Sequence, residues 1–82
     1  MDEAVKELTM LMLYLTAWVD NEGYPKGELR SWKGYPYQAL NQLMDEEMIT
    51  GSYKAKSVYL TEEGKKLAQR LAAKYGIEDP WA

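Results

Sequence analysis

The chain has 82 residues and a formal net charge of −3, and 46% of its residues are hydrophobic, which predicts one folded domain over residues 1–82. It has no cysteine, which excludes disulfide and thiolate chemistry and fits a cytoplasmic protein, and no histidine, the commonest general base and metal ligand. The negative charge excludes a protein whose whole surface attracts nucleic acid, so any such contact must be local.

The first predicted element is a helix from about Asp2 to Val19 that is apolar on two sides. One side carries Val5, Leu8, Met12, Leu15 and Val19. In a small domain, a second apolar side predicts a homodimer interface. That interface is predicted to consist of Met10, Leu13, Tyr14 and Ala17, with Trp81 from the C-terminal tail. The alternative is that the tail, with Ile77 and Trp81, folds back over this side. The helix is too short to cross a membrane, and its acidic start does not suit a signal peptide.

The segment from residue 20 to residue 36 contains several glycines and prolines and predicts turns. Leu29 and Trp32 predict one short helical turn within it. A mixed basic and aromatic cluster follows, consisting of Arg30, Lys33, Tyr35 and Tyr37. Trp32 and Tyr37 are expected to lie in the core.

A second helix is predicted over about residues 36–48, because its apolar residues recur at three and four positions. Its apolar face carries Tyr37, Leu40, Leu43 and Met44, and its polar face carries Gln38, Asn41, Gln42 and Asp45. Amide side chains on an exposed helix can read adenine through paired hydrogen bonds, so the three amides are candidate base contacts. The alternative is an ordinary solvated face, and Asp45 would repel phosphate.

Alternation of polar and apolar residues predicts two short strands, at Ile49–Thr50 and over residues 57–60. The loop between them carries Lys54 and Lys56, whose long cations could reach a phosphate or a minor groove. The alternative is that these lysines only protect an exposed hairpin edge. Thr61 is then placed to cap a final helix that ends at Gly76.

Two runs around these strands carry a resemblance. The first is Leu43-Met44-Asp45-Glu46-Glu47-Met48-Ile49, and the second is Leu60-Thr61-Glu62-Glu63-Gly64. They are similar to the Leu-Glu-x-x-Gly-Leu-Ile and Leu-Thr-x-x-Gly runs of winged-helix proteins, including MarR-like and PadR-like regulators. Glu47 stands where glycine is usual. Residues 1–16 and 30–40 also resemble a small uncharacterised group of prokaryotic winged-helix domains.

The resemblance implies an α+β winged helix with three main helices and a two-stranded β-hairpin wing, and a DNA-binding role in transcription regulation. The chain departs from this family because residues 20–36 leave room only for a stub of the helix that normally precedes the recognition helix. That departure affects the geometry with which the recognition helix would enter the major groove.

We expect no enzyme activity, catalytic residue, metal or cofactor, because no spacing matches a metal cage, a phosphate-binding loop or an activated nucleophile. The prediction is a protein that binds double-stranded DNA through the helix at about 36–48 and the wing at about 52–58. The candidate contacts are Arg30, Lys33, Tyr35, Gln38, Asn41, Gln42, Lys54 and Lys56. One alternative is a winged-helix module that binds a protein partner and no DNA. Another is a small-molecule sensor whose pocket is made of Trp18, Trp32, Tyr35 and Tyr37.

Overall fold

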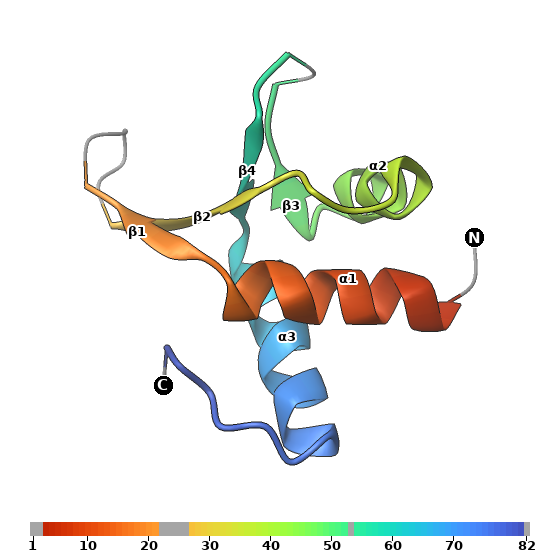
Figure 1. The fold of residues 1–82 in the computed structure, drawn as a ribbon, viewed down its shortest axis with the longest axis vertical. Coiled ribbons are helices and arrows are strands. Elements are labelled where there is room, and N and C mark those ends of the chain that lie inside the picture. The colour runs from red at the N-terminus through yellow and green to blue at the C-terminus, as the bar shows by residue number, and fades with distance from the viewer. Residues whose placement is uncertain (1–2, 22–26, 53, 82) are drawn as a thin grey trace.

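The computed structural model describes residues 3–21, 27–52 and 54–81, and within these ranges the chain forms three helices and four strands (Figure 1). Their order is α1 (Glu3–Leu15), β1 (Trp18–Asp20), β2 (Glu28–Trp32), α2 (Tyr37–Asp45), β3 (Ile49–Thr50), β4 (Ser57–Leu60) and α3 (Glu62–Lys74). The predicted α+β class and the three main helices are therefore confirmed. None of these helices has the length and apolar character needed to cross a membrane.

The strands form one antiparallel sheet in the order β1-β2-β4-β3. The predicted two-stranded hairpin is not confirmed, because β4 pairs with β2 as well as with β3. The short helical turn predicted around Leu29 and Trp32 is wrong, since these residues belong to β2. Leu29 and Ser31 are buried on one face of β2, whereas Trp32 points to the other face, which is the period of two expected for a strand.

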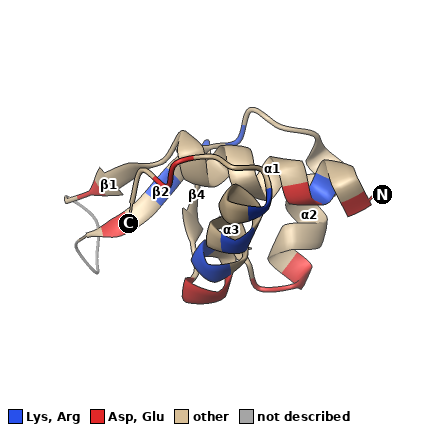
Figure 2. Ribbon diagram, turned by 90° about the horizontal axis from the view of Figure 1, so that it is seen from below, with Lys and Arg blue, Asp and Glu red and all other residues tan. Residues whose placement is uncertain are grey.

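The core lies between the helices and one face of the sheet, and Figure 2 shows the three helices gathered to one side of β1, β2 and β4. Its buried residues come from every helix and from three strands. They are Met10, Leu13, Tyr14, Leu29, Leu40, Leu43, Ile49, Val58, Leu60 and Ala68. A smaller cluster of Leu11, Leu71 and Ala72 joins α1 to α3. Within the described residues, the helices thus cover one face of the two central strands.

The first helix is shorter than predicted and buries the opposite side. It ends at Leu15, and Trp18–Asp20 forms β1 instead of a last helical turn. Met10, Leu13 and Tyr14 are 0% exposed within the chain, so their assignment to a dimer surface is wrong. The exposed side carries Val5, Leu8 and Met12, each more than a third exposed.

The C-terminal tail accounts for part of this difference, because it folds back over the end of α1. The indole Nε1 of Trp81 donates to the carbonyl of Tyr14 (2.9 Å), and the Tyr14 hydroxyl donates to Asp79 Oδ1 (2.6 Å). Ala17 packs against the core as well. The alternative prediction, a tail that folds back over this side, is confirmed for Trp81 by its hydrogen bond to Tyr14, although Trp81 and Ile77 are both still more than a third exposed.

The turn after α2 is fastened to the start of α3. The Met48 carbonyl accepts from the Thr61 backbone N–H (3.1 Å), and the Thr61 hydroxyl accepts from the Gly64 N–H (3.0 Å), which confirms the predicted cap. A Cβ on Gly64 would lie 1.9 Å from the Met48 carbonyl oxygen, so only glycine fits. Glu47, in the position where glycine is usual, has a left-handed backbone with φ of +62°. The two resembling runs therefore form one joint between α2, β3 and α3.

Candidate nucleic-acid interface

Three lysines lie near one another where the end of β2 meets the loop between β3 and β4. The backbone N–H of Lys33 donates to the Lys56 carbonyl (3.0 Å), and Lys33 Nζ donates to the Ser52 carbonyl (2.9 Å). The Lys54 backbone N–H is bound to the side chain of the same Ser52 (3.3 Å). We call Lys33, Lys54 and Lys56 the lysine cluster. The loop that carries Lys54 and Lys56 projects from the rest of the fold (Figure 1).

The lysine cluster has no carboxylate partner in the described part of the chain. The ion pairs found there use other cations, namely Lys6, Arg30, Lys65 and Lys66. Lys54 and Lys56 are exposed, and Lys33 is half-buried against the loop. The cluster therefore concentrates positive charge next to the segment that leads into α2, although the whole chain is acidic.

The amide face of α2 is accessible. Gln38 is exposed, and Asn41 and Gln42 are half-buried, while Leu40 and Leu43 are buried on the opposite side. The Gln42 side-chain amide donates to Glu46 Oε2 (3.2 Å), which ties it to the acidic end of the helix. Gln38, in the first turn, is the most exposed of the three amide side chains.

The far end of α2 is acidic and anchored to α1. Buried Lys6 binds Glu46 Oε1 (2.9 Å) and Glu3 Oε1 (3.0 Å). The hydrogen bond from Lys6 lowers the pKa of Glu46, and the same bond raises the pKa of Lys6. The carboxylates therefore lie at the C-terminal end of α2, whereas Lys33 of the lysine cluster precedes the first residue of α2 by four positions.

Arg30 was predicted as a phosphate contact, but it is engaged within the sheet. Its Nη1 donates to Asp20 Oδ2 (2.9 Å) and to the Tyr59 hydroxyl (3.1 Å), and its Nε donates to Ser57 Oγ. The Tyr59 hydroxyl also donates to Asp20 Oδ2 (2.9 Å), and this bond raises the pKa of Tyr59. Asp20 thus neutralises Arg30 and links β1, β2 and β4, so Arg30 does not belong to the candidate interface.

The aromatic residues are arranged differently from the prediction. Trp32 and Tyr37 are 60% and 58% exposed, so their assignment to the core is wrong. Trp32 lies on the uncovered face of β2, where its ring centroid is 4.8 Å from that of Trp18. Tyr35 is half-buried, and its hydroxyl is 3.3 Å from Thr16 Oγ1 at the end of α1. Tyr35 therefore anchors the segment before α2.

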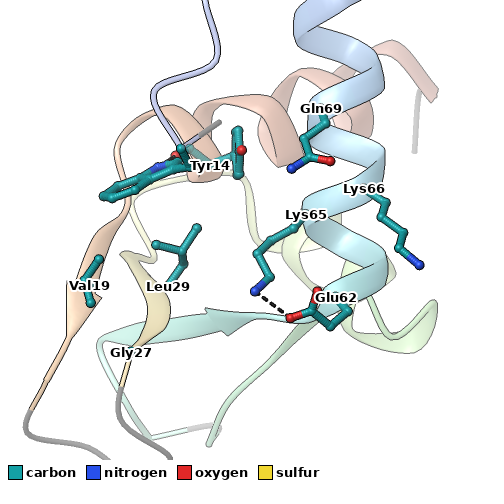
Figure 3. A pocket seen from close by; sticks show the side chains of 9 residues that line it. Tyr14, Val19, Gly27, Leu29, Glu62, Lys65, Lys66 and Gln69 are labelled. Atoms are coloured by element: carbon teal, nitrogen blue, oxygen red, sulfur yellow. Dashed lines mark hydrogen bonds and ion pairs between the residues drawn. The ribbon is translucent and has the colours of Figure 1, made fainter.

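A cavity lies away from both the lysine cluster and the predicted aromatic pocket. It has a volume of about 390 Å³ and opens between the β1–β2 pair, α3 and the tail (Figure 3). Its lining consists of Tyr14, Val19, Gly27, Leu29, Glu62, Lys65, Lys66, Gln69 and Trp81. Inside it, Lys65 Nζ is paired with Glu62 at 2.7 Å. Sequence reasoning missed this cavity because four distant segments form it.

A comparison with protein families found one match that spans most of the chain. The family is described as a domain of unknown function (DUF6429), and its model matches residues 1–78. Neither the curated proteins nor the solved structures gave a match. Within the described residues, no group of acidic side chains is placed to hold a metal ion. Function must therefore be argued from the geometry above.

Proposed function

Since the chain belongs to the DUF6429 family, a domain of unknown function, we propose its role from its geometry: it is a winged-helix protein that binds duplex DNA. The observation that carries this proposal is the lysine cluster, held against the segment that leads into α2. In this proposal, the β3–β4 loop is the wing and α2 is the recognition helix. The resemblance of the sequence to MarR-like and PadR-like regulators adds a proposed role in transcription regulation.

The order of elements supports the proposal. Helix α2 is followed by the β3–β4 pair and then by α3, and β4 pairs with a strand that precedes α2. The β1–β2 pair occupies the stretch in which a winged helix has its second helix. Because the described residues between α1 and α2 form strands and no helix, α2 is positioned by the sheet and by the Lys6–Glu46 ion pair instead. In this proposal the first turn of α2 enters a groove of the DNA, as in recognition helices whose first turns contact bases.

The charge distribution supports a local and weak contact. Three lysines neutralise at most about three phosphates, so the logarithm of the affinity should fall with the logarithm of salt with a slope of about −2.7. Base reading would come from Gln38, while the acidic end of α2 faces away from the phosphates. We therefore expect binding that is measurable at low salt and weak at physiological salt.

The experiment is a fluorescence anisotropy titration of a labelled mixed-sequence duplex at low salt. In the variant Lys33→Ala/Lys54→Ala/Lys56→Ala, we expect affinity to fall at least about tenfold and the salt slope to flatten by about 2.7. The matched control is Lys66→Ala/Arg70→Ala/Lys74→Ala, which removes three cations from α3 and should bind like the wild type. Loss of binding in the control but not in the first variant would contradict the proposal.

A second candidate is a protein-interaction module, and the exposed side of α1 favours it. Val5, Leu8 and Met12 recur at three and four positions and are each more than a third exposed. Exposed apolar patches of this kind mark interaction sites. A homodimer through α1 would use these residues in place of the buried ones first predicted. The absence of duplex binding even at low salt would favour this candidate.

A further inference from the structure

In the part of the chain that the structure describes, no helix covers the second face of the sheet, and the strand register determines which residues lie on that face. Trp18 pairs with Arg30, and Arg30 pairs with Tyr59, so these residues share a face with Trp32, two positions along β2. We call Trp18, Arg30, Trp32 and Tyr59 the outer sheet face. The opposite face, which carries Leu29, Ser31 and Val58, is buried beneath the helices.

The outer sheet face is held together by contacts between its own side chains, and its charged groups are Arg30, Asp20 and, at the end of β2 away from Trp32, Glu28. The Arg30 guanidinium lies over the Tyr59 ring, 4.8 Å from its centroid, and both groups are bound to the buried carboxylate of Asp20. Trp18 packs against Trp32 at a tilt of 43°. Trp32 is nevertheless 60% exposed, so most of its indole is in contact with solvent. A fixed, exposed indole beside a neutralised network is a surface on which a planar ring can stack.

Two lysines of the cluster lie one position beyond this indole, at the same end of the β2–β4 pair. Lys33 follows Trp32 directly in the chain, and Lys56 precedes Ser57, which is paired with Trp32 across the ladder. Because successive side chains alternate between the faces of the sheet, both lysines leave the ladder on the face opposite the indole. A strand that stacks a base on Trp32 and passes round this end of the sheet therefore meets a cation on each of two neighbouring strands. A planar base attached to a phosphate backbone has this combination of an aromatic ring and flanking negative charges.

We propose that Trp32 is the stacking surface for an unpaired base of single-stranded DNA, whose backbone is held by the lysine cluster. This inference rests on the proposed function and adds single-stranded DNA as a second ligand, because the same lysines hold the phosphates of both forms of DNA. In a duplex, each base is already stacked on its neighbours and is not available to Trp32. A single strand, or a base that has left the stack, gains an additional contact.

The test compares three probes of equal backbone length, each about 12 nucleotides long. They are oligo(dT), an abasic strand with the same phosphates, and a mixed-sequence duplex. We expect oligo(dT) to quench tryptophan fluorescence and to bind about tenfold more tightly than the abasic strand. Trp32→Ala should lower the affinity for oligo(dT) about tenfold and leave the abasic strand and the duplex unchanged, whereas Trp32→Phe should retain most of the binding.

The control is Tyr75→Ala, which removes another exposed aromatic residue, beyond α3, and should change none of the three affinities. Thermal unfolding of each variant checks that the fold is retained. Equal binding of oligo(dT) and the abasic strand, or an unchanged affinity in Trp32→Ala, would overturn the inference while the duplex result stands. Failure of all three probes to bind at low salt would overturn the proposed function together with the inference.

Discussion

Gly64→Ala is expected to destabilise the fold by about 3 kcal/mol, the upper end of the range for forcing a methyl group into a packed site. The added Cβ would meet the Met48 carbonyl oxygen at 1.9 Å, and that carbonyl is fixed by its hydrogen bond from the Thr61 N–H. Because the contact is with backbone, no side chain can rotate to relieve it. Urea unfolding measures the change in the free energy of unfolding.

Whether Gly64→Ala lowers or raises the free energy of unfolding is decisive, because helix propensity alone predicts that it raises it. Replacing a glycine inside a helix by alanine normally stabilises by up to about 1 kcal/mol. Glu47→Gly is the matched control on the other side of the joint, where φ is +62° and glycine relieves strain of about 1 kcal/mol. An alanine at position 64 that leaves stability unchanged or higher would show that α3 and the α2–β3 turn do not approach this closely.

Asp20→Ala is expected to destabilise the fold by about 2 kcal/mol, because it leaves the Arg30 guanidinium without its carboxylate inside the sheet. The figure is below that for a fully buried pair, since the Arg30 side chain is 31% exposed and partly screened by water. The double variant with Arg30→Met should lose less stability than the sum of the two single variants. Strict additivity would mean that the two side chains do not interact.

Asp20→Ala is also expected to change the titration of the Tyr59 hydroxyl. The hydrogen bond to Asp20, together with desolvation, raises the pKa of Tyr59. A raised tyrosine pKa means that the stabilising contribution is present below the ordinary value of about 10 and is lost as pH rises through the folded value. Asp20→Ala should therefore lower the pKa of Tyr59, seen as earlier phenolate absorbance, and should make stability less dependent on pH above about 10.

Sequence reasoning located the second half of the chain well, because its signals are local. The spacing of Leu40 and Leu43 marks the buried side of α2, and Thr61 marks the start of α3 by the cap it forms. The β2 strand was missed because buried Ser31 hides its alternation, and the three-residue spacing of Leu29 and Trp32 also fits a helical turn. The apolar residues of α1 predict a helix, but because they lie on both of its sides they do not indicate which side faces the core.

The residues of the candidate interface could be predicted only in part, because some of their contacts depend on strand register rather than on local sequence. The loop position of Lys54 and Lys56 indicates exposure, whereas the partner of Arg30 lies ten residues away on a neighbouring strand and is set by register. Trp32 was placed in the core because large apolar residues usually lie there. An exposed tryptophan departs from that expectation, and for this reason it carries information about binding.

The central claim, that DNA meets the lysine cluster and the first turn of α2, is tested most directly by mapping backbone amide shifts during a titration with duplex DNA at low salt. We expect the largest shifts at Lys33, Gln38, Lys54 and Lys56, with little change along α3. The largest shifts at Lys66, Arg70 and Lys74, or no shifts at saturating duplex, would contradict the account.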